Sequence, residues 1–327
     1  VPEIAQMIAE AACATQQGPL ANFQMDEADF YELRVAALLH DCGKVTTPVH
    51  VMDKSTKLYT LVDRIDHVET RLELLRRDRT LIALQRRFPE VAHALTHDAV
   101  LQEELADLSA SREFLRRVNI GGERMTGEDQ QRVRDLATRY LWQDAQGCTQ
   151  PVLTSNEVEN LNIARGTLTL EERKVIENHV TVTIKMLSGL PFPKHLRQVP
   201  EFAGGHHERT DGTGYPLGLR GEQMSVQARI MAVADIFEAL TAHDRPYKKP
   251  MPLSQSLGIL CELCQRGQID KDIFRVFIQQ RVYLDYARTH LAPDQIDCVD
   301  ETKLLCALEG DAPTTPTPIP RCHCCRE

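Results

Sequence analysis

Histidine and aspartate residues with metal-binding potential occur as two adjacent pairs far apart in the sequence. His206 and His207 form one pair, and His40 and Asp41 form the other. Adjacent imidazoles can bind one metal ion, and the carboxylate of a His-Asp pair can bind a second ion and bridge the two. Each pair alone is explained as well by an exposed loop or a polar helix end. Together, the pairs predict a folded site with two metal ions.

Two further features of the sequence support this site. The His206-His207 pair precedes a turn-rich run in which Gly212 and Gly214 permit unusual backbone angles and Pro216 stiffens the exit. Asp235 lies inside an apolar stretch that is expected to form a buried helix. A buried carboxylate is costly unless it is paired or bound to metal, so metal coordination is the simplest explanation of Asp235.

Helices must position these residues, because apolar residues recur at helical spacing along nearly the whole chain. Asp26 is a suitable N-cap for a helix over residues 27–40, which would place His40 and Asp41 at its C-terminal end. The run Thr169-Leu170-Glu171-Glu172 forms a capping box for the helix that carries His179. Two more helices are expected over residues 226–242 and 270–290. The sequence therefore predicts an all-α fold.

A long segment without metal-binding pairs separates the two halves of the predicted site. Its apolar residues follow three helical stripes, which comprise Leu61, Ile65, Val68, Leu72, Leu75 and Ile82, then Leu101, Leu105 and Leu108, then Val133, Leu136 and Tyr140. Its arginines are expected to form solvated faces with acidic residues, with a substrate-binding patch as the alternative. We expect a catalytic domain over residues 1–52 and 166–300 and a helical hairpin or small subdomain inserted over 53–165. A Pro/Thr-rich tail over 311–327 ends in the cluster Cys322 to Cys325, which we interpret as exposed thiols rather than a metal site.

Composition excludes several classes of protein. The 327 residues, 42% of them hydrophobic, can bury one large core or one core with an appendage. The net charge of −9 argues against binding of polymeric nucleic acid. No apolar run reaches the ~18 residues of a membrane span, no signal peptide opens the chain, and the ten cysteines show no disulfide spacing. We therefore expect a cytoplasmic protein, and a start at Val1 in a helical pattern suggests an upstream sensory domain.

The order of these motifs resembles the HD-GYP family, whose members linearise cyclic dinucleotide second messengers. The matching segments are residues 38–44 (Leu-Leu-His-Asp-Cys-Gly-Lys), His179, residues 206–216, residues 228–235, and residues 244–248 (Asp-Arg-Pro-Tyr-Lys). The resemblance implies an HD-superfamily helical bundle, from which the segment over 53–165 departs as an insertion.

The resemblance also implies a metal-ligand set. By analogy, His40, Asp41 and Asp235 bind one ion, and His179, His206 and His207 bind the other, with Asp41 bridging them. Imidazole and carboxylate ligands suit two divalent ions of Fe, Mn, Ni or Zn. Some family members bind a third metal through an upstream histidine and glutamate. We expect no third metal in this segment, because no histidine precedes His40 in it, with a histidine just upstream of Val1 as the alternative.

Substrate contacts and activity follow from the same resemblance. Lys44 is expected to contact the scissile phosphate, and Arg245 and Lys248 the second phosphate, while Tyr215 either stacks on a base or fixes the loop. The implied reaction hydrolyses cyclic di-GMP to pGpG, with onward conversion to GMP in some members. The alternatives are a preference for hybrid cyclic GMP-AMP, a signalling module that binds without turnover, and a generic HD nucleotide phosphohydrolase. A homodimer is a further assembly to test.

Overall fold

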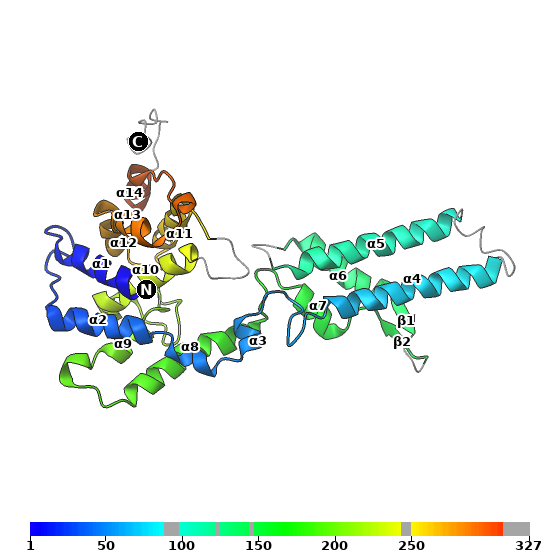
Figure 1. Cartoon of the computed structure of the whole chain (residues 1–327), viewed down its shortest axis with the longest axis horizontal. Coiled ribbons are helices and arrows are strands. Elements are labelled where there is room, and N and C mark those ends of the chain that lie inside the picture. The colour runs from blue at the N-terminus through cyan, green and yellow to red at the C-terminus, as the bar shows by residue number, and fades with distance from the viewer. Residues whose placement is uncertain (88–97, 122–124, 144–146, 243–249, 310–327) are drawn as a thin grey trace. The chain divides into compact units, whose positions relative to one another are not determined.

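The computed structural model describes residues 1–87, 98–121, 125–143, 147–242 and 250–309 (Figure 1). These residues confirm the predicted all-α fold. Apart from isolated bridges, their only sheet pairs the short antiparallel strands β1 (Leu141–Gln143) and β2 (Thr149–Pro151). The chain divides into two compact units, one formed by residues 1–46 with those from 177 onward, and one formed by residues 47–176. The predicted tail over 311–327 lies outside the described residues.

The first unit is a bundle of helices around one large core. Its α-helices are α1 (Pro2–Cys13), α2 (Glu27–Leu39), α9 (Val199–Gly204), α10 (Val226–Thr241), α11 (Leu253–Gln265), α12 (Lys271–Gln279), α13 (Val282–His290) and α14 (Glu301–Glu309), joined by α8 (Leu170–Ser188), which begins in the second unit. Short 3-10 turns are η1 (Cys42–Thr46), η3 (Lys194–Leu196), η4 (Gly221–Gln223) and η5 (Pro293–Gln295). Helix α1 packs against α2 and α10, and α2 packs against α9. The core therefore holds together the helices that carry the predicted ligands.

The predicted caps fix where the helices of the site begin. The Asp26 carboxylate accepts the amide of Asp29 at 2.9 Å, and the Asp29 carboxylate accepts the amide of Asp26 at 3.0 Å. Thr169 and Glu172 form the same reciprocal pair at the start of α8, with distances of 3.2 and 2.9 Å. Each pair satisfies two amides that the first helical turn leaves without partners. The predicted N-cap at Asp26 and the predicted capping box at Thr169 are both confirmed, and the return bond from Asp29 makes the Asp26 cap a capping box as well.

The single helix predicted over residues 270–290 is wrong, because the chain turns sharply between α12 and α13. Arg281 adopts the left-handed conformation at φ 54°, which a helix interior cannot contain. The Arg281 guanidinium pairs with the Glu301 carboxylate at 3.0 Å, which offsets part of the cost of this conformation. The turn lets Phe277 in α12 and Tyr283 in α13 both enter the core.

The second unit has its own hydrophobic core. Its helices are α3 (Val49–Met52), α4 (Ile65–Arg87), α5 (Ala99–Asn119), α6 (Gly127–Arg139) and α7 (Ser155–Leu161), together with the first residues of α8. The predicted stripes are buried from Ile65 to Leu75 in α4 and at Val133, Leu136 and Tyr140. Leu61 and Ile82 were predicted in the stripe but are 82% and 44% exposed. Leu61 precedes the first turn of α4, and the buried side of that helix ends at Leu75.

Arginines of this unit mainly pair with acids, as predicted. Arg76 and Arg77 both contact Glu73 on the same helix, and other pairs join Arg79 to Glu104 and Arg87 to Asp98. Arg71 differs, because its Nη2 donates to both carboxylate oxygens of the buried Glu157 of α7 at 2.7 Å. That pair ties α4 to α7 rather than forming a solvated face. None of the described helices has the length and apolarity required to cross a bilayer.

Candidate metal centre

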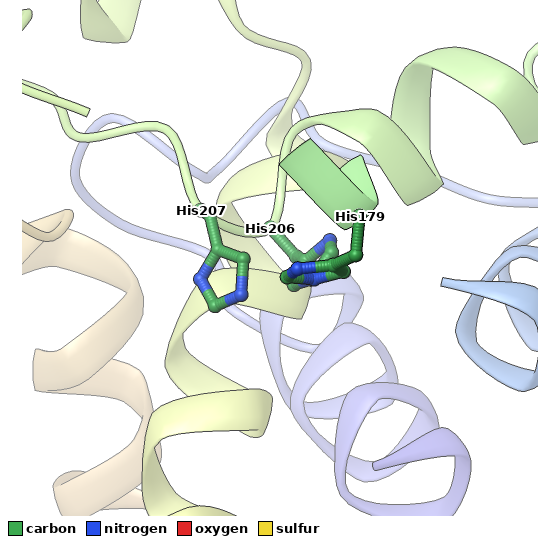
Figure 2. Close-up of side chains that lie close together, drawn as sticks. All are labelled: His179, His206 and His207. Carbon is green, nitrogen blue, oxygen red and sulfur yellow. The ribbon is translucent and has the colours of Figure 1, made fainter. Parts of the chain in front are cut away.

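The predicted ligands meet at one place in the first unit although they come from four regions of the chain. His40 caps the C-terminus of α2 and Asp41 follows it, His179 lies in the middle of α8, and the His206-His207 pair follows α9. Figure 2 shows His179, His206 and His207 gathered together. Two groups of three residues each bring their donor atoms within 4.8 Å of one another. One group is His179, His206 and His207, and the other is His40, Asp41 and His206.

Asp41 lies between these groups, with its two carboxylate oxygens directed at different imidazoles. Its Oδ1 is 3.2 Å from His179 Nε2 and 3.9 Å from His206 Nε2, and its Oδ2 is 3.3 Å from His40 Nε2. Asp235, from α10, has its Oδ1 3.5 Å from the same His40 nitrogen. A carboxylate in this position can bind one ion through each oxygen.

Backbone carbonyls orient two of the imidazoles. His40 Nδ1 lies 2.8 Å from the Ala37 carbonyl oxygen, and His206 Nδ1 lies 2.5 Å from the Ala203 carbonyl oxygen. Each carbonyl accepts a hydrogen bond from Nδ1–H, so that in the neutral ring the lone pair is on Nε2, which faces the centre. A neutral imidazole in this tautomer can bind a metal through Nε2.

Burial and neighbouring charges divide the histidines into two classes. Burial lowers the pKa of His206 to about 4 and that of His207 to about 3, so both rings are neutral at pH 7 and available as ligands. Burial also acts to lower the pKa of His40, but the neighbouring carboxylates of Asp235 and Asp41 outweigh it and raise the pKa to about 9. Metal binding at His40 must therefore displace a proton at neutral pH.

Several buried atoms of this cluster have donor or acceptor capacity left over. His40 Nε2, His206 Nε2 and Asp41 Oδ1 are buried and form no hydrogen bond with any other described residue. Each such atom costs about 1–3 kcal/mol when it lacks a partner. Divalent cations would supply the missing partners of these atoms, and the mixture of imidazole and carboxylate suits Fe, Mn, Ni or Zn. The residues therefore fit a metal, and the cluster is able to hold one.

A close backbone contact sets the position of Asp41 relative to His179. The amide of Gly43 donates to Thr183 Oγ1 at 2.9 Å, and a Cβ atom on Gly43 would lie 2.0 Å from the His179 carbonyl oxygen. Only glycine allows η1 to approach α8 this closely. Sequence reasoning assigned no role to Gly43 or Thr183, and the glycine between Asp41 and Lys44 was the available signal.

Two of the four predicted substrate-binding residues, Lys44 and Tyr215, lie beside the metal centre. Lys44 Nζ lies 2.5 Å from Asp41 Oδ2, and the Lys44 side chain is 41% exposed, so its ammonium sits at the edge of the centre. Arg245 and Lys248 lie outside the described residues. Tyr215 stacks on the His207 ring, with centroids 4.8 Å apart and planes 28° apart. One face of Tyr215 is therefore occupied by a proposed ligand, which agrees with the loop-fixing interpretation.

Glu208 is a further residue of the site for which sequence reasoning proposed no role. It follows His207, is 3% exposed, and accepts the amides of Leu217 and Leu219 at 2.7 and 2.8 Å. Its position directly after two candidate ligands was the available signal. Its partners could not be inferred, because they depend on the path of the loop.

Comparison with known proteins matches part of this chain, including His179, His206, His207 and Asp235, to a recognised domain. Residues 152–273 match the HD domain family. The chain is 38% identical over 117 residues to the 3′3′-cGAMP-specific phosphodiesterase 1 of Vibrio cholerae, covering 35% of the chain and 26% of the relative. It is 42% identical over 91 residues to a cyclic di-GMP phosphodiesterase of Thermotoga maritima (28% and 24%) and 46% identical over 74 residues to one of Pseudomonas aeruginosa (23% and 17%). These matches span about a quarter or less of each relative. They confirm the resemblance to the HD-GYP family that was inferred from the motifs.

Proposed function

We propose that this chain, which carries an HD domain, is a metal-dependent phosphodiesterase that hydrolyses a cyclic dinucleotide. The observation that carries the proposal is the position of Asp41, whose two oxygens face imidazoles from α2 and α8. The relatives support it, since they are named as phosphodiesterases of cyclic di-GMP or 3′3′-cGAMP. The chain spans only part of those relatives, so activity and substrate are proposals for this protein.

The proposed centre holds two divalent ions. His40, Asp41 and Asp235 would hold one ion, and His179, His206 and His207 would hold the other, with Asp41 contributing to both. When bound, the ions would activate a water molecule for attack on phosphorus and offset charge on the phosphate oxygens. The carbonyls of Ala37 and Ala203 hold two of the imidazoles in the required tautomer. The metal number and the choice among Fe, Mn, Ni and Zn belong to this proposal.

Lys44 supplies positive charge at the edge of the centre. Its ammonium pairs with the Asp41 carboxylate, and its exposed end can reach a phosphate that approaches the ions. A lysine in this position would stabilise the negative charge that develops on the scissile phosphate. Tyr215, through its stack on His207, fixes the loop, and the phosphate contacts of Arg245 and Lys248 stay predictions.

Cyclic di-GMP, cleaved to pGpG with onward conversion to GMP as a slower step, is the proposed substrate. Hybrid cyclic GMP-AMP is the second candidate, because relatives named for each nucleotide are similar to this chain. A binding module without turnover is not favoured, since all six proposed ligands are present and gathered. The domain boundaries, a homodimer, an upstream sensory domain and a cytoplasmic location stay predictions.

Product analysis tests the proposal. The purified chain would be stripped with a chelator, reconstituted with Mn²⁺ or with Fe²⁺ under anaerobic conditions, and incubated with cyclic di-GMP and with 3′3′-cGAMP. Chromatography should show the linear dinucleotide from the reconstituted protein and none from the stripped protein, and the ratio of the two rates decides the substrate. Binding of either nucleotide without product under all metals would instead identify a binding module.

A further inference from the structure

One buried carboxylate beside the metal centre has no part in the proposed reaction. The carboxylate of Glu208 accepts two backbone hydrogen bonds, from the Leu217 amide to Oε1 and from the Leu219 amide to Oε2. A buried carboxylate is tolerated when several N–H groups donate to it, and such charge-assisted bonds are stronger than neutral ones. The two bonds join the beginning of the loop over residues 208–219 to its end.

The interior of this loop packs against the same point. A Cβ atom on Gly214 would lie 2.5 Å from Glu208 Cα and 2.3 Å from the Arg209 nitrogen, so the loop closes on the backbone of Glu208. The amide of the next residue, Tyr215, donates to the His207 carbonyl at 3.2 Å. The ring of Tyr215 is thereby placed over the His207 imidazole. Glu208, Gly214 and Tyr215 together fix one closed loop over His207.

His207 depends on this loop more than its neighbours do. His40 and His206 are oriented by carbonyl oxygens at Nδ1. The contacts described for the His207 ring are with other rings, those of His179, His206 and Tyr215. The Tyr215 stack, with its 28° interplanar angle, is the flattest of these contacts. The orientation of the His207 imidazole therefore follows the position of Tyr215.

We propose that Glu208 is a positioning residue for the metal centre. By holding the loop closed, its carboxylate keeps Tyr215 stacked on His207 and so fixes the His207 imidazole as a ligand. The inference rests on the proposed function only in taking His207 as a ligand. Outer partners of metal ligands commonly contribute about 10–100-fold to metal affinity, and Glu208 is expected to contribute within that range.

The variant Glu208→Gln tests this role against a matched control. Glutamine keeps the size of the side chain but turns one acceptor into a donor that faces a backbone N–H. Glu32 on α2 is a similar carboxylate, 7% exposed, which accepts the Gln198 amide at 2.6 Å outside this loop. Both Glu208→Gln and Glu32→Gln should lower the urea midpoint of the metal-stripped chain. Only Glu208→Gln should also weaken Zn²⁺ binding, by about 10–100-fold, in competition with a chelating dye.

Substitutions of Tyr215 show whether Glu208 acts through the stack. Tyr215→Leu should weaken Zn²⁺ binding and Tyr215→Phe should not, because the ring and not the hydroxyl covers His207. Adding Glu208→Gln to Tyr215→Leu should cause little further loss, since both changes remove the same support. If Glu208→Gln does not fold, the Zn²⁺ affinities of Tyr215→Leu and Tyr215→Phe still test whether the loop orients His207.

Four results would overturn the inference: wild-type Zn²⁺ affinity in Glu208→Gln, an equal loss in Glu32→Gln, full additivity of the double variant, or wild-type affinity in Tyr215→Leu. The readout is metal binding rather than turnover. A protein that shows the expected pattern of Zn²⁺ affinities but cleaves no cyclic dinucleotide would contradict the proposed function and leave the role of Glu208 intact.

Discussion

Replacement of Gly43 by alanine should destabilise the protein and disturb the metal centre together. The new Cβ would lie 2.0 Å from the His179 carbonyl oxygen and 2.7 Å from the Thr183 nitrogen, and these backbone atoms cannot rotate away as a side chain can. Overpacking of this kind costs about 1–3 kcal/mol, and the displaced Gly43 hydrogen bond to Thr183 adds about 1 kcal/mol. A glycine-to-alanine change restricts the unfolded chain and returns roughly 0.5–1 kcal/mol. The net loss in free energy of unfolding is therefore about 1–3.5 kcal/mol.

Gly258 in α11 provides the matched control. No atom lies within 4 Å of a Cβ at this position, so Gly258→Ala carries the same change in the unfolded chain without a clash. It should stabilise the helix by about 0.5–1 kcal/mol. For a unit of this size, Gly43→Ala should lower the melting temperature by about 2–14 °C, measured by circular dichroism on the metal-free chain. It should also weaken metal binding, because η1 must move away from α8. Equal melting temperatures for Gly43→Ala and wild type would refute the reasoning.

Three other predictions concern the metal centre. Asp41→Asn should abolish turnover and lower the bound metal measured by elemental analysis, because it removes a ligand from both proposed ions. Normal metal content with full activity would contradict the dinuclear arrangement. Lys44→Ala should keep the metal content while lowering kcat by about 10²-fold or more, since the lysine charge acts on the phosphate. Loss of metal in this variant would show that the role of Lys44 was misassigned. Metal affinity should rise with pH between pH 7 and about 9, by at most about tenfold per unit, because the raised pKa of His40 makes a proton compete with the metal below about 9. Calorimetry in buffers of different ionisation enthalpy should detect that proton, and a pH-independent affinity would contradict it.

Local signals in the sequence were sufficient for much of the fold. The reciprocal caps at Asp26 and Thr169 depend on residues three positions apart, so the helix starts could be predicted and are confirmed. The break between α12 and α13 at Arg281 could not be predicted from local sequence, because it depends on Glu301 and on burial of Tyr283 after the turn. Leu61 was misjudged for a related reason, since apolar spacing does not show where α4 begins.

The ligand set was inferred from motifs, and the structure gathers its members without testing the role of each. The contacts that support them could not be predicted, because each joins residues distant in sequence. Gly43 meets Thr183 across 140 positions, and Glu208 meets Leu219 only when the intervening loop closes. A glycine and a glutamate beside ligands are visible in the sequence, but their partners follow from the folded backbone.

Anomalous diffraction from crystals of the metal-reconstituted chain tests the central claim most directly. We expect two peaks roughly 3.5–4 Å apart, one beside His40 and Asp235 and one beside the three clustered histidines, with an Asp41 oxygen bound to each. Elemental analysis of the same sample should give two metal ions per chain. A single fully occupied ion, or two ions that do not share Asp41, would contradict the account.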